Sequence, residues 1–399
     1  MDVIVTGGGI VGTCAAMLLA KDGHHVTVLE RDAGEPPDDP RDAWTGWERR
    51  GVNQFRLLHY FQPRFREIVE RELPEVVSAL QRAGALRFSF IENVPESMSG
   101  GLRDGDERFA SLTARRPVAE AAVAAVARET LGLDIRRGVA VAGLLTGPSA
   151  ADGIPHVTGV RTEAGEELRA DVVVDATGRR SPLPAWLSAI GAPPVDEEMD
   201  DSGFVYYGRY FRSGDGSVPP LMGPPLYYCG SVALLVLPAD NGTWGIGVIA
   251  LSGDKPLRGL TDTDRWTELV RTFPLHAHWL DGEPLDERVV TMAKLEDRRR
   301  RLVVDGAPVV TGVLPLGDSW ACTNPSVGRG ISIGMIHAVA LRDFLRGAVD
   351  DPHKTAQAWD EATRSTVDPY YESTVAHDRH RLAEMQAVID GRSYEGDAG

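Results

Sequence analysis

The hydrophobic pattern of the first 30 residues predicts a strand, a tight turn, a helix and a second strand. An apolar run at Val3–Thr6 indicates a buried strand, and a second such run covers His25–Leu29. The segment between them, from about Ile10 to Asp22, has the length and composition of a helix. These elements together form a βαβ unit, which places two parallel strands side by side.

Two further helices are expected in the first half of the chain. The first runs from about Gln62 to Ala83, and Pro74 kinks or divides it because proline cannot donate the helical hydrogen bond. The second begins at Pro117, a favourable first position, and ends near Leu131. Short strands follow over residues 134–175.

The pattern changes to mainly β between Phe204 and Leu251, where aromatic and β-branched residues alternate with Pro-Gly clusters. A last buried strand, Val309–Leu316, then leads through a glycine-rich turn into a helix over Gly330–Leu345. We therefore expect an α/β protein with a Rossmann-like nucleotide domain and a mainly antiparallel second domain. The expected boundaries are a nucleotide domain in two parts, 1–190 and 290–350, a β-sheet substrate domain at 191–289, and a C-terminal helical segment at 351–399.

The turn after the first strand carries the glycine spacing of a dinucleotide site. Gly7, Gly9 and Gly12 occupy the G-x-G-x-x-G positions, which allow a tight turn, close approach of a pyrophosphate, and close packing of helix on strand. The helix N-terminus offers free N–H groups to phosphates. Glu30, with Arg31 beside it, ends the second strand, where a carboxylate can accept hydrogen bonds from a ribose.

The composition of the chain restricts the kinds of molecule that it can bind and the compartment in which we expect it. The net charge of −16 opposes binding to a phosphate backbone, so nucleic acid is excluded as a partner, and the run Arg298–Arg301 is interpreted as a solvated turn. The distant cysteines Cys14, Cys229 and Cys322 fit neither a disulfide framework nor a metal site. With no long apolar run and a strand that starts at Asp2, we expect a cytoplasmic protein without a signal peptide or a membrane span.

Two later segments of the chain carry motifs that belong together with the glycine motif of the first turn. The segment Asp171–Leu187, DVVVDATGRRSPLPAWL, is a buried strand that enters a turn, and Pro315–Ala338, PLGDSWACTNPSVGRGISIGMIHA, is a strand, an acid, a glycine loop and a helix. With the first motif they resemble the flavoprotein monooxygenase family of the aromatic-hydroxylase and squalene-epoxidase type, related to flavin-dependent halogenases and geranylgeranyl reductases. The resemblance implies a glutathione-reductase-type fold that binds FAD noncovalently.

The resemblance also implies roles for single residues. Asp318 corresponds to the "GD" aspartate that accepts hydrogen bonds from the flavin ribityl chain, and Gly328 and Gly330 let the backbone approach the flavin ring. Arg116 corresponds to an arginine at the flavin phosphate or ribityl groups, and Val141 to a backbone contact with adenine.

The departures from the family pattern concern the electron source. Where the hydroxylases carry Asp-Gly, then Ser, then Arg, this sequence keeps the serine as Ser181 but has Thr177 at the aspartate position and Pro184 at the arginine position. NADPH or NADH is therefore expected to supply electrons either directly or through a separate flavin reductase. Halogenases carry a lysine in the region after the first βαβ unit, but no lysine lies between Lys21 and Lys255. Halogenation is therefore disfavoured.

Several other residues have two interpretations. His59 either orients substrate or relays a proton, or it is a loop histidine bonded to backbone. His337 is interpreted as a packing or surface group, and Cys322 as a small buried hydrophobe rather than a covalent flavin link. Trp44, Trp47 and Trp320 either wall the flavin or substrate cavity or simply fill space in the core. Arg41 is a candidate to touch the flavin phosphate or to gate the movement of the flavin.

The expected activity is monooxygenation: one oxygen of O2 is inserted, through a flavin C4a-hydroperoxide, into an apolar small molecule by aromatic hydroxylation or alkene epoxidation. Such chemistry needs no acid–base dyad, and the sequence identifies no catalytic residue. The substrate wall should come from the 204–251 sheet. The alternatives are an FAD-dependent reductase of the geranylgeranyl-reductase type that acts on a C=C bond, and a non-catalytic FAD-binding or carrier-docking protein.

Overall fold

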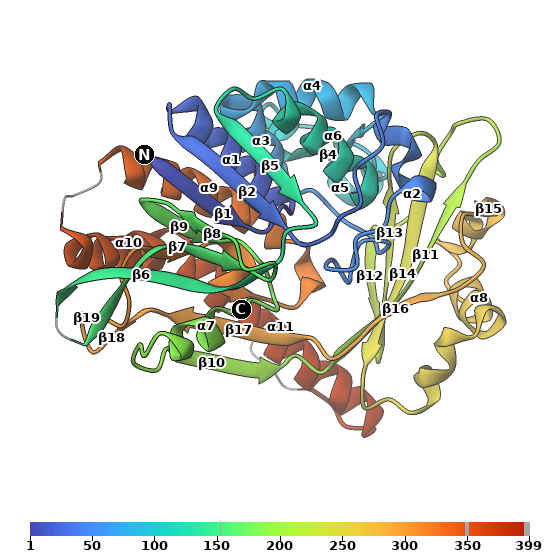
Figure 1. Cartoon of the computed structure of the whole chain (residues 1–399). Helices are drawn as coiled ribbons and strands as arrows, with labels where there is room; N and C mark the ends of the chain where they lie inside the picture. Colours follow the sequence, from blue (N-terminus) through green and yellow to red (C-terminus); the bar gives the residue numbers. More distant parts are fainter. Residues whose placement is uncertain (152, 348–350, 395–399) are drawn as a thin grey trace.

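The computed structural model describes residues 1–151, 153–347 and 351–394, which Figure 1 shows arranged around two sheets. A parallel sheet with its helices forms one lobe, and an antiparallel sheet with helix α8 forms the other. The first lobe combines blue to green segments from the first half of the chain with orange and red segments from its end, so the yellow second lobe is an insertion between them.

The parallel sheet has the strand order β20-β9-β1-β2-β5. Its alternating side chains enter two cores: Val3 and Val5 of β1 pack with the helices on one face, and Ile4 packs on the other. The bounds of its strands are β1 Asp2–Thr6, β2 His25–Glu30, β5 Leu133–Arg137, β9 Val172–Asp175 and β20 Val313–Pro315.

Helices cover the first face of the parallel sheet, and a small antiparallel sheet covers the second. The helices are α1 Ile10–Lys21, α3 Pro63–Glu72, α4 Pro74–Arg82, α6 Arg116–Arg128, α9 Gly330–Arg346 and α10 Pro352–Thr366. The second face carries β6 Val141–Ala151, β7 Ile154–Thr162, β8 Glu167–Arg169 and α7 Leu183–Ala189.

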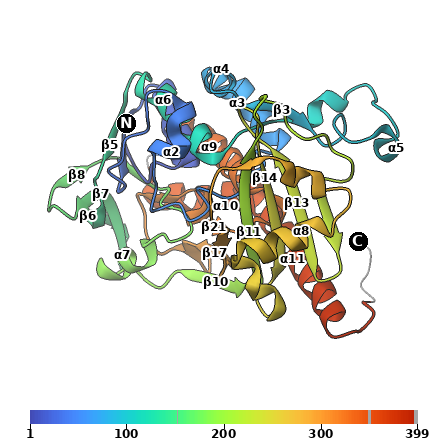
Figure 2. The same cartoon turned by 90° about the vertical axis from the view of Figure 1, so that its right-hand side faces the viewer.

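The second lobe is an antiparallel sheet of order β12-β13-β14-β11-β15, with β16 also paired to β11. Its strands are β11 Phe204–Arg212, β12 Leu226–Cys229, β13 Val232–Pro238, β14 Thr243–Leu251, β15 Glu283–Pro284 and β16 Val290–Met292. Helix α8 (Thr263–Arg271) lies across its outer face, as the turned view in Figure 2 shows. At the other end, Met385 of the long helix α11 (Asp368–Ile389) packs on Phe204 and Leu251.

Smaller elements complete the described chain. The remaining strands and α-helices are α2 Ala43–Gly46, β3 Leu86–Ser89, α5 Glu96–Ser99, β4 Ala110–Thr113, β18 Val303–Val304 and β19 Ala307–Pro308. The 3-10 helices are Pro40–Asp42, Asp106–Phe109, Pro256–Thr261, Ala277–Asp281, Gly317–Ser319 and Pro325–Val327.

The interpretation of Arg298–Arg301 as a solvated turn is wrong. These arginines lie on β17 (Glu296–Arg301), between β10 (Asp196–Asp201) and β21 (Ala321–Cys322). Arg300 is only 3% exposed, and its guanidinium pairs with Glu197. The run of charge forms a strand because the acidic strand β10 pairs with it residue by residue.

The predicted α/β class is confirmed, with a parallel sheet beside antiparallel ones. The expected helix over 62–83 is divided at Pro74, as α3 ends at Glu72 and α4 begins at Pro74 itself. The last buried strand is shorter than expected, since only Val313–Pro315 pairs within the parallel sheet. The domain boundaries stay a prediction, and residues 348–350 and 395–399 lie outside the described residues.

The described ranges contain helices of very different lengths, from α2 with four residues to α11 with 22. None of them combines the length with the apolar character that a bilayer span requires.

Candidate functional site

A cavity of about 750 Å³ lies between the carboxyl ends of the parallel strands and the inner face of the antiparallel sheet. All ten residues that the sequence predicted for a cofactor line it. They are Gly7, Gly9, Gly12, Glu30, Arg31, Arg116, Val141, Asp318, Gly328 and Gly330. The topology thus brings three distant motifs to one place, the switch point at which open α/β sheets bind ligands.

The glycines of the first turn serve two purposes: two of them allow close approach of neighbouring backbone, and one leaves its backbone open to the cavity. Gly7 has φ +103°, and a Cβ there would lie 2.4 Å from the Ala176 carbonyl oxygen. A Cβ on Gly12 would lie 2.2 Å from the Gly7 carbonyl oxygen, so this glycine allows α1 to pack on β1. A Cβ on Gly9 would meet no protein atom within 4 Å. Gly9 therefore leaves its backbone open to the cavity at the uncapped N-terminus of α1.

Glu30 is held by the protein itself. Its Oε2 accepts from the Gly8 N–H at 2.8 Å, its Oε1 accepts from the Asp32 N–H at 2.8 Å, and it forms an ion pair with Arg49. Because Oε2 also accepts from Arg49 Nη2, only Oε1 keeps a second lone pair. Acceptance of a ribose hydroxyl by Glu30 stays a prediction.

Among the arginines of the 32–55 loop, Arg49 lines the cavity, beside residues 51–54 of the same loop. Its Nη1 donates to Glu120 at 2.6 Å and to the Gly8 carbonyl at 2.9 Å, and its side chain is 3% exposed. Its Nε is buried without a hydrogen-bond partner among the described residues. The candidate from the sequence, Arg41, is exposed and pairs with Asp39 instead. No local sequence signal separates the two arginines.

His59 lines the cavity but is held as a neutral ring. Its Nδ1 lies 2.9 Å from the Leu57 carbonyl and its Nε2 lies 3.0 Å from Arg116 Nη1. The carbonyl requires a proton on Nδ1, and the guanidinium requires a free pair on Nε2. Burial and Arg116 together lower the pKa of His59 to about 3. His59 is thus bonded to backbone, and neither nitrogen is free to relay a proton.

Asp318 lies at the cavity wall after β20, without a hydrogen-bond donor. Burial raises the pKa of its carboxyl, while Arg179 and Arg116 lower it from a distance. No described residue donates a hydrogen bond to this half-buried carboxylate, which lines the cavity. A Cβ on Gly330 at the start of α9 would be 4.0 Å from Asp318 Oδ1, so the two residues are neighbours. A ligand rich in hydroxyl groups would satisfy this carboxylate.

The remaining wall is apolar and comes from the second lobe. Its residues include Tyr206, Leu235, Leu237, Gly247 and Ile249. This agrees with the prediction that the 204–251 sheet provides the wall of a substrate site.

The tryptophans named from the sequence lie elsewhere. Trp44 packs on Tyr210 with ring centroids 5.0 Å apart, Trp47 packs on Phe55, and Trp320 packs on His337. None of the three lines the cavity, because each fills a core between elements.

His337 and Cys322 are both packing residues, as the sequence predicted. His337 is 1% exposed and bonds the Gly317 N–H and Thr363. Cys322 is 2% exposed, and burial raises the pKa of its thiol to about 11. A buried, protonated thiol outside the cavity is not placed for a covalent flavin link.

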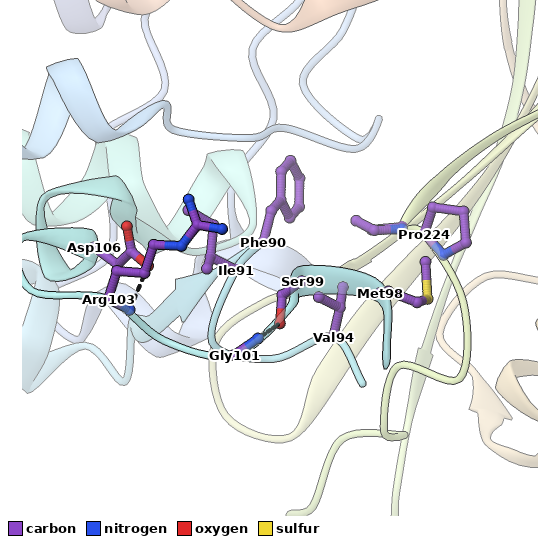
Figure 3. A pocket seen from close by; sticks show the side chains of 10 residues that line it. Phe90, Ile91, Val94, Met98, Ser99, Gly101, Arg103, Asp106 and Pro224 are labelled. Carbon is purple, nitrogen blue, oxygen red and sulfur yellow. Dashed lines mark hydrogen bonds between the residues drawn. The ribbon is translucent and has the colours of Figure 1, made fainter. Parts of the chain in front are cut away.

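A smaller hollow of about 330 Å³ adjoins the cavity, between the 90–106 loop and Pro224 (Figure 3). Phe90 lines both spaces, and its ring stacks on Tyr60 at 4.5 Å. Phe90 is therefore the wall that the hollow and the cavity share.

These observations agree with the chemistry of FAD. The open backbone at Gly9 suits phosphates, and the donor-free carboxylate of Asp318 suits a ribityl chain. Among the described residues, no group of three or more His, Cys, Asp or Glu side chains is placed to hold a metal ion.

Comparison with known proteins gives relatives in sequence and in structure. No family model matches the chain. Protein Rv3254 of Mycobacterium tuberculosis is 27% identical over 369 residues, which cover 86% of this chain and 72% of that protein.

Solved structures superpose on nearly the whole chain. PqsL of Pseudomonas aeruginosa, "a probable FAD-dependent monooxygenase", has a TM-score of 0.67 at 17% identity, with 98% of this chain and 99% of PqsL covered. The 2-methyl-3-hydroxypyridine-5-carboxylic acid oxygenase has a TM-score of 0.61 at 16% identity, covering 96% and 92%. The Diels-Alderase PyrE3 of pyrroindomycin biosynthesis has a TM-score of 0.62 at 18% identity, covering 98% and 76%. The chain has the fold of the FAD-dependent monooxygenases.

Proposed function

We propose that the protein is an FAD-dependent monooxygenase that inserts one oxygen atom of O2 into an apolar small molecule. One observation supports this most strongly. The ten residues predicted for FAD line a single cavity that continues onto the apolar wall of the antiparallel sheet. The solved structures with this fold include an oxygenase of an aromatic acid and PqsL in complex with 2-aminobenzoylacetate.

Each part of the cavity has a separate task. The turn at Gly9 would hold the pyrophosphate, Asp318 the ribityl hydroxyls, and the backbone at Gly328 the flavin ring. Reduced flavin supplies the activation of O2. The protein supplies orientation and exclusion of water, through apolar walls such as Leu235 and Ile249.

Aromatic hydroxylation and alkene epoxidation are the two forms of the proposed reaction. Electrons come from NADPH or NADH, either directly or through a separate flavin reductase. Mixing FAD-loaded protein with each nicotinamide in a stopped-flow spectrometer separates these routes. Rapid bleaching of the flavin band indicates direct reduction, and no bleaching indicates a reductase partner.

Isotope incorporation tests the reaction class. FAD-loaded protein, supplied with reduced flavin and a panel of aromatic and alkene compounds under ¹⁸O2, is expected to form products that carry one ¹⁸O atom. The control is the same mixture without oxygen, in which product formation should cease. Turnover of a C=C bond at an undiminished rate without oxygen would contradict monooxygenation and favour the reductase alternative.

A further inference from the structure

The helix α11 brings a buried carboxyl group to the back of the cavity. Ser326 lines the cavity, and its hydroxyl donates to Asp378 Oδ1. Beside it, the Tyr206 hydroxyl donates to Asn324 Oδ1 at 2.8 Å, and Tyr206 also lines the cavity. Asp378 is 2% exposed. A continuous set of polar groups therefore connects the cavity wall with the C-terminal helix.

Asp378 lacks the charged partners that two other buried carboxylates, Asp240 and Glu120, have. Asp240 forms an ion pair with Arg115, and Glu120 pairs with two arginines. Asp378 forms no ion pair with a described residue, and its Oδ2 is buried with no hydrogen-bond partner among them. An unpaired buried carboxylate is costly, so this group accepts a proton readily.

The groups that face Asp378 come from several elements. Burial raises the pKa of Asp378 to about 7, and Asp297 of β17 raises it further. The hydrogen bond from Ser326, the neighbouring amide of Asn324 and the Arg329 guanidinium at the start of α9 lower it. The phenols of Tyr206 and Tyr228 face it from the antiparallel sheet.

On α11 itself, the charged side chain three residues after Asp378 already has other partners. Arg381 pairs with Glu384 and lies 3.9 Å over the Tyr228 ring. His377 beside Asp378 has its pKa lowered by burial and by Arg329, so it adds no fixed positive charge near neutral pH. Asp378 is thus the group of this cluster that changes charge near neutral pH.

The hydroxyl groups of Tyr206 and Ser326 both donate their hydrogen bonds to acceptors within the protein. Asn324 Oδ1 can only accept, so the Tyr206 proton is directed to it, and an ionised Asp378 likewise takes the Ser326 proton. The lone pairs of Tyr206 and Ser326 are then left for a bound molecule. The cavity wall at this point consequently favours a ligand that donates an O–H or N–H hydrogen bond.

We propose that Asp378 is a positioning residue that takes up a proton from the bound substrate through the Ser326 hydroxyl. The substrate, on the basis of the proposed function, is an apolar molecule with an acidic O–H or N–H group. The substrate O–H bond breaks, its proton bonds to Ser326 Oγ, and the Ser326 proton passes to Asp378 Oδ1. No electrons are transferred; the substrate becomes an anion and Asp378 becomes neutral.

Infrared difference spectroscopy with 3-nitrophenol as the probe tests this step without turnover. The FAD-loaded protein is held at about pH 7.5, above the pKa of the Asp378 carboxyl and below that of the free phenol, so that Asp378 is ionised and the added probe still carries its proton. Addition of the probe should produce the C=O band of a protonated carboxyl, together with the visible absorption of bound 3-nitrophenolate. Both signals should be lost in Asp378→Asn and in Ser326→Ala.

The matched control is Asp390→Asn at the exposed end of the same helix, which should keep both signals. Circular dichroism shows whether each variant is folded, and Ser326→Ala keeps the test valid if Asp378→Asn does not fold. A protonated-carboxyl band that persists in both variants, or no band in the native protein, overturns the proposal. Because no oxygen is consumed, a failure of oxygenation alone would not produce these results.

Discussion

The substitution Gly9→Val is expected to abolish FAD binding while the protein remains folded. Gly9 has φ −75° and ψ 174°, which any residue adopts, and its Cβ would meet no protein atom. The valine side chain would instead project into the cavity, where the pyrophosphate must approach the helix N-terminus. Loss of these charge-assisted hydrogen bonds should weaken FAD binding by about 100-fold or more, or ~3 kcal/mol. Retention of FAD on a desalting column, measured by visible absorbance, gives the result.

Two other glycines provide controls for this experiment. Gly253→Val lies at an exposed position with no neighbour within 4 Å, and it should leave both fold and FAD binding unchanged. Gly12→Val should instead impair folding, because its side chain would meet the Gly7 carbonyl. If Gly9→Val binds FAD as the native protein does, this turn does not hold the pyrophosphate.

The substitution Arg49→Met should destabilise the protein by about 3–5 kcal/mol, because it removes one partner of a buried ion cluster. Glu30 and Glu120, 4% exposed each, would then be left with too few positive partners. Although burial raises the pKa of Glu120, Arg49 and Arg116 lower it further, so the group is ionised and depends on them. Urea denaturation of the FAD-saturated proteins measures the loss.

Arg41→Met is the matched control, since it removes an arginine from the same loop. Arg41 is exposed and pairs with a neighbour in solvent, so no measurable change in stability is expected. Equal denaturation midpoints for the two variants would mean that the Arg49 cluster adds nothing to stability.

The cofactor motifs were predictable because each depends on local spacing. Gly7, Gly9 and Gly12 fall within six residues, and Asp318 follows directly after a buried strand. A strand that ends in such a turn specifies where its side chains lie relative to the sheet edge. Parallel pairing of β9 with β1 and β20 then brings the separate motifs together.

The errors concern residues whose partners lie far away in the sequence. Arg299 and Arg300 of β17 are buried because an acidic strand some 100 residues earlier pairs with them. Arg49 rather than Arg41 reaches the cavity because Glu120 of α6 lies opposite it. Charge runs and aromatic residues in a loop without periodicity carry no signal for such long-range pairing.

The cluster at Asp378 was likewise not predictable from the sequence, because it depends on contacts between distant segments. Tyr206, Ser326 and Asp378 come from a strand, a loop and a helix that have no common motif. Only the packing of α11 beside the antiparallel sheet brings them to one wall of the cavity.

Analysis of the bound cofactor tests the central claim most directly. Protein reconstituted with FAD, desalted and then denatured should release one flavin per chain, identified as FAD by its visible spectrum and mass. The Gly9→Val protein treated in parallel should release none. A native protein that is folded by circular dichroism but releases no flavin would contradict the assignment of this cavity to FAD.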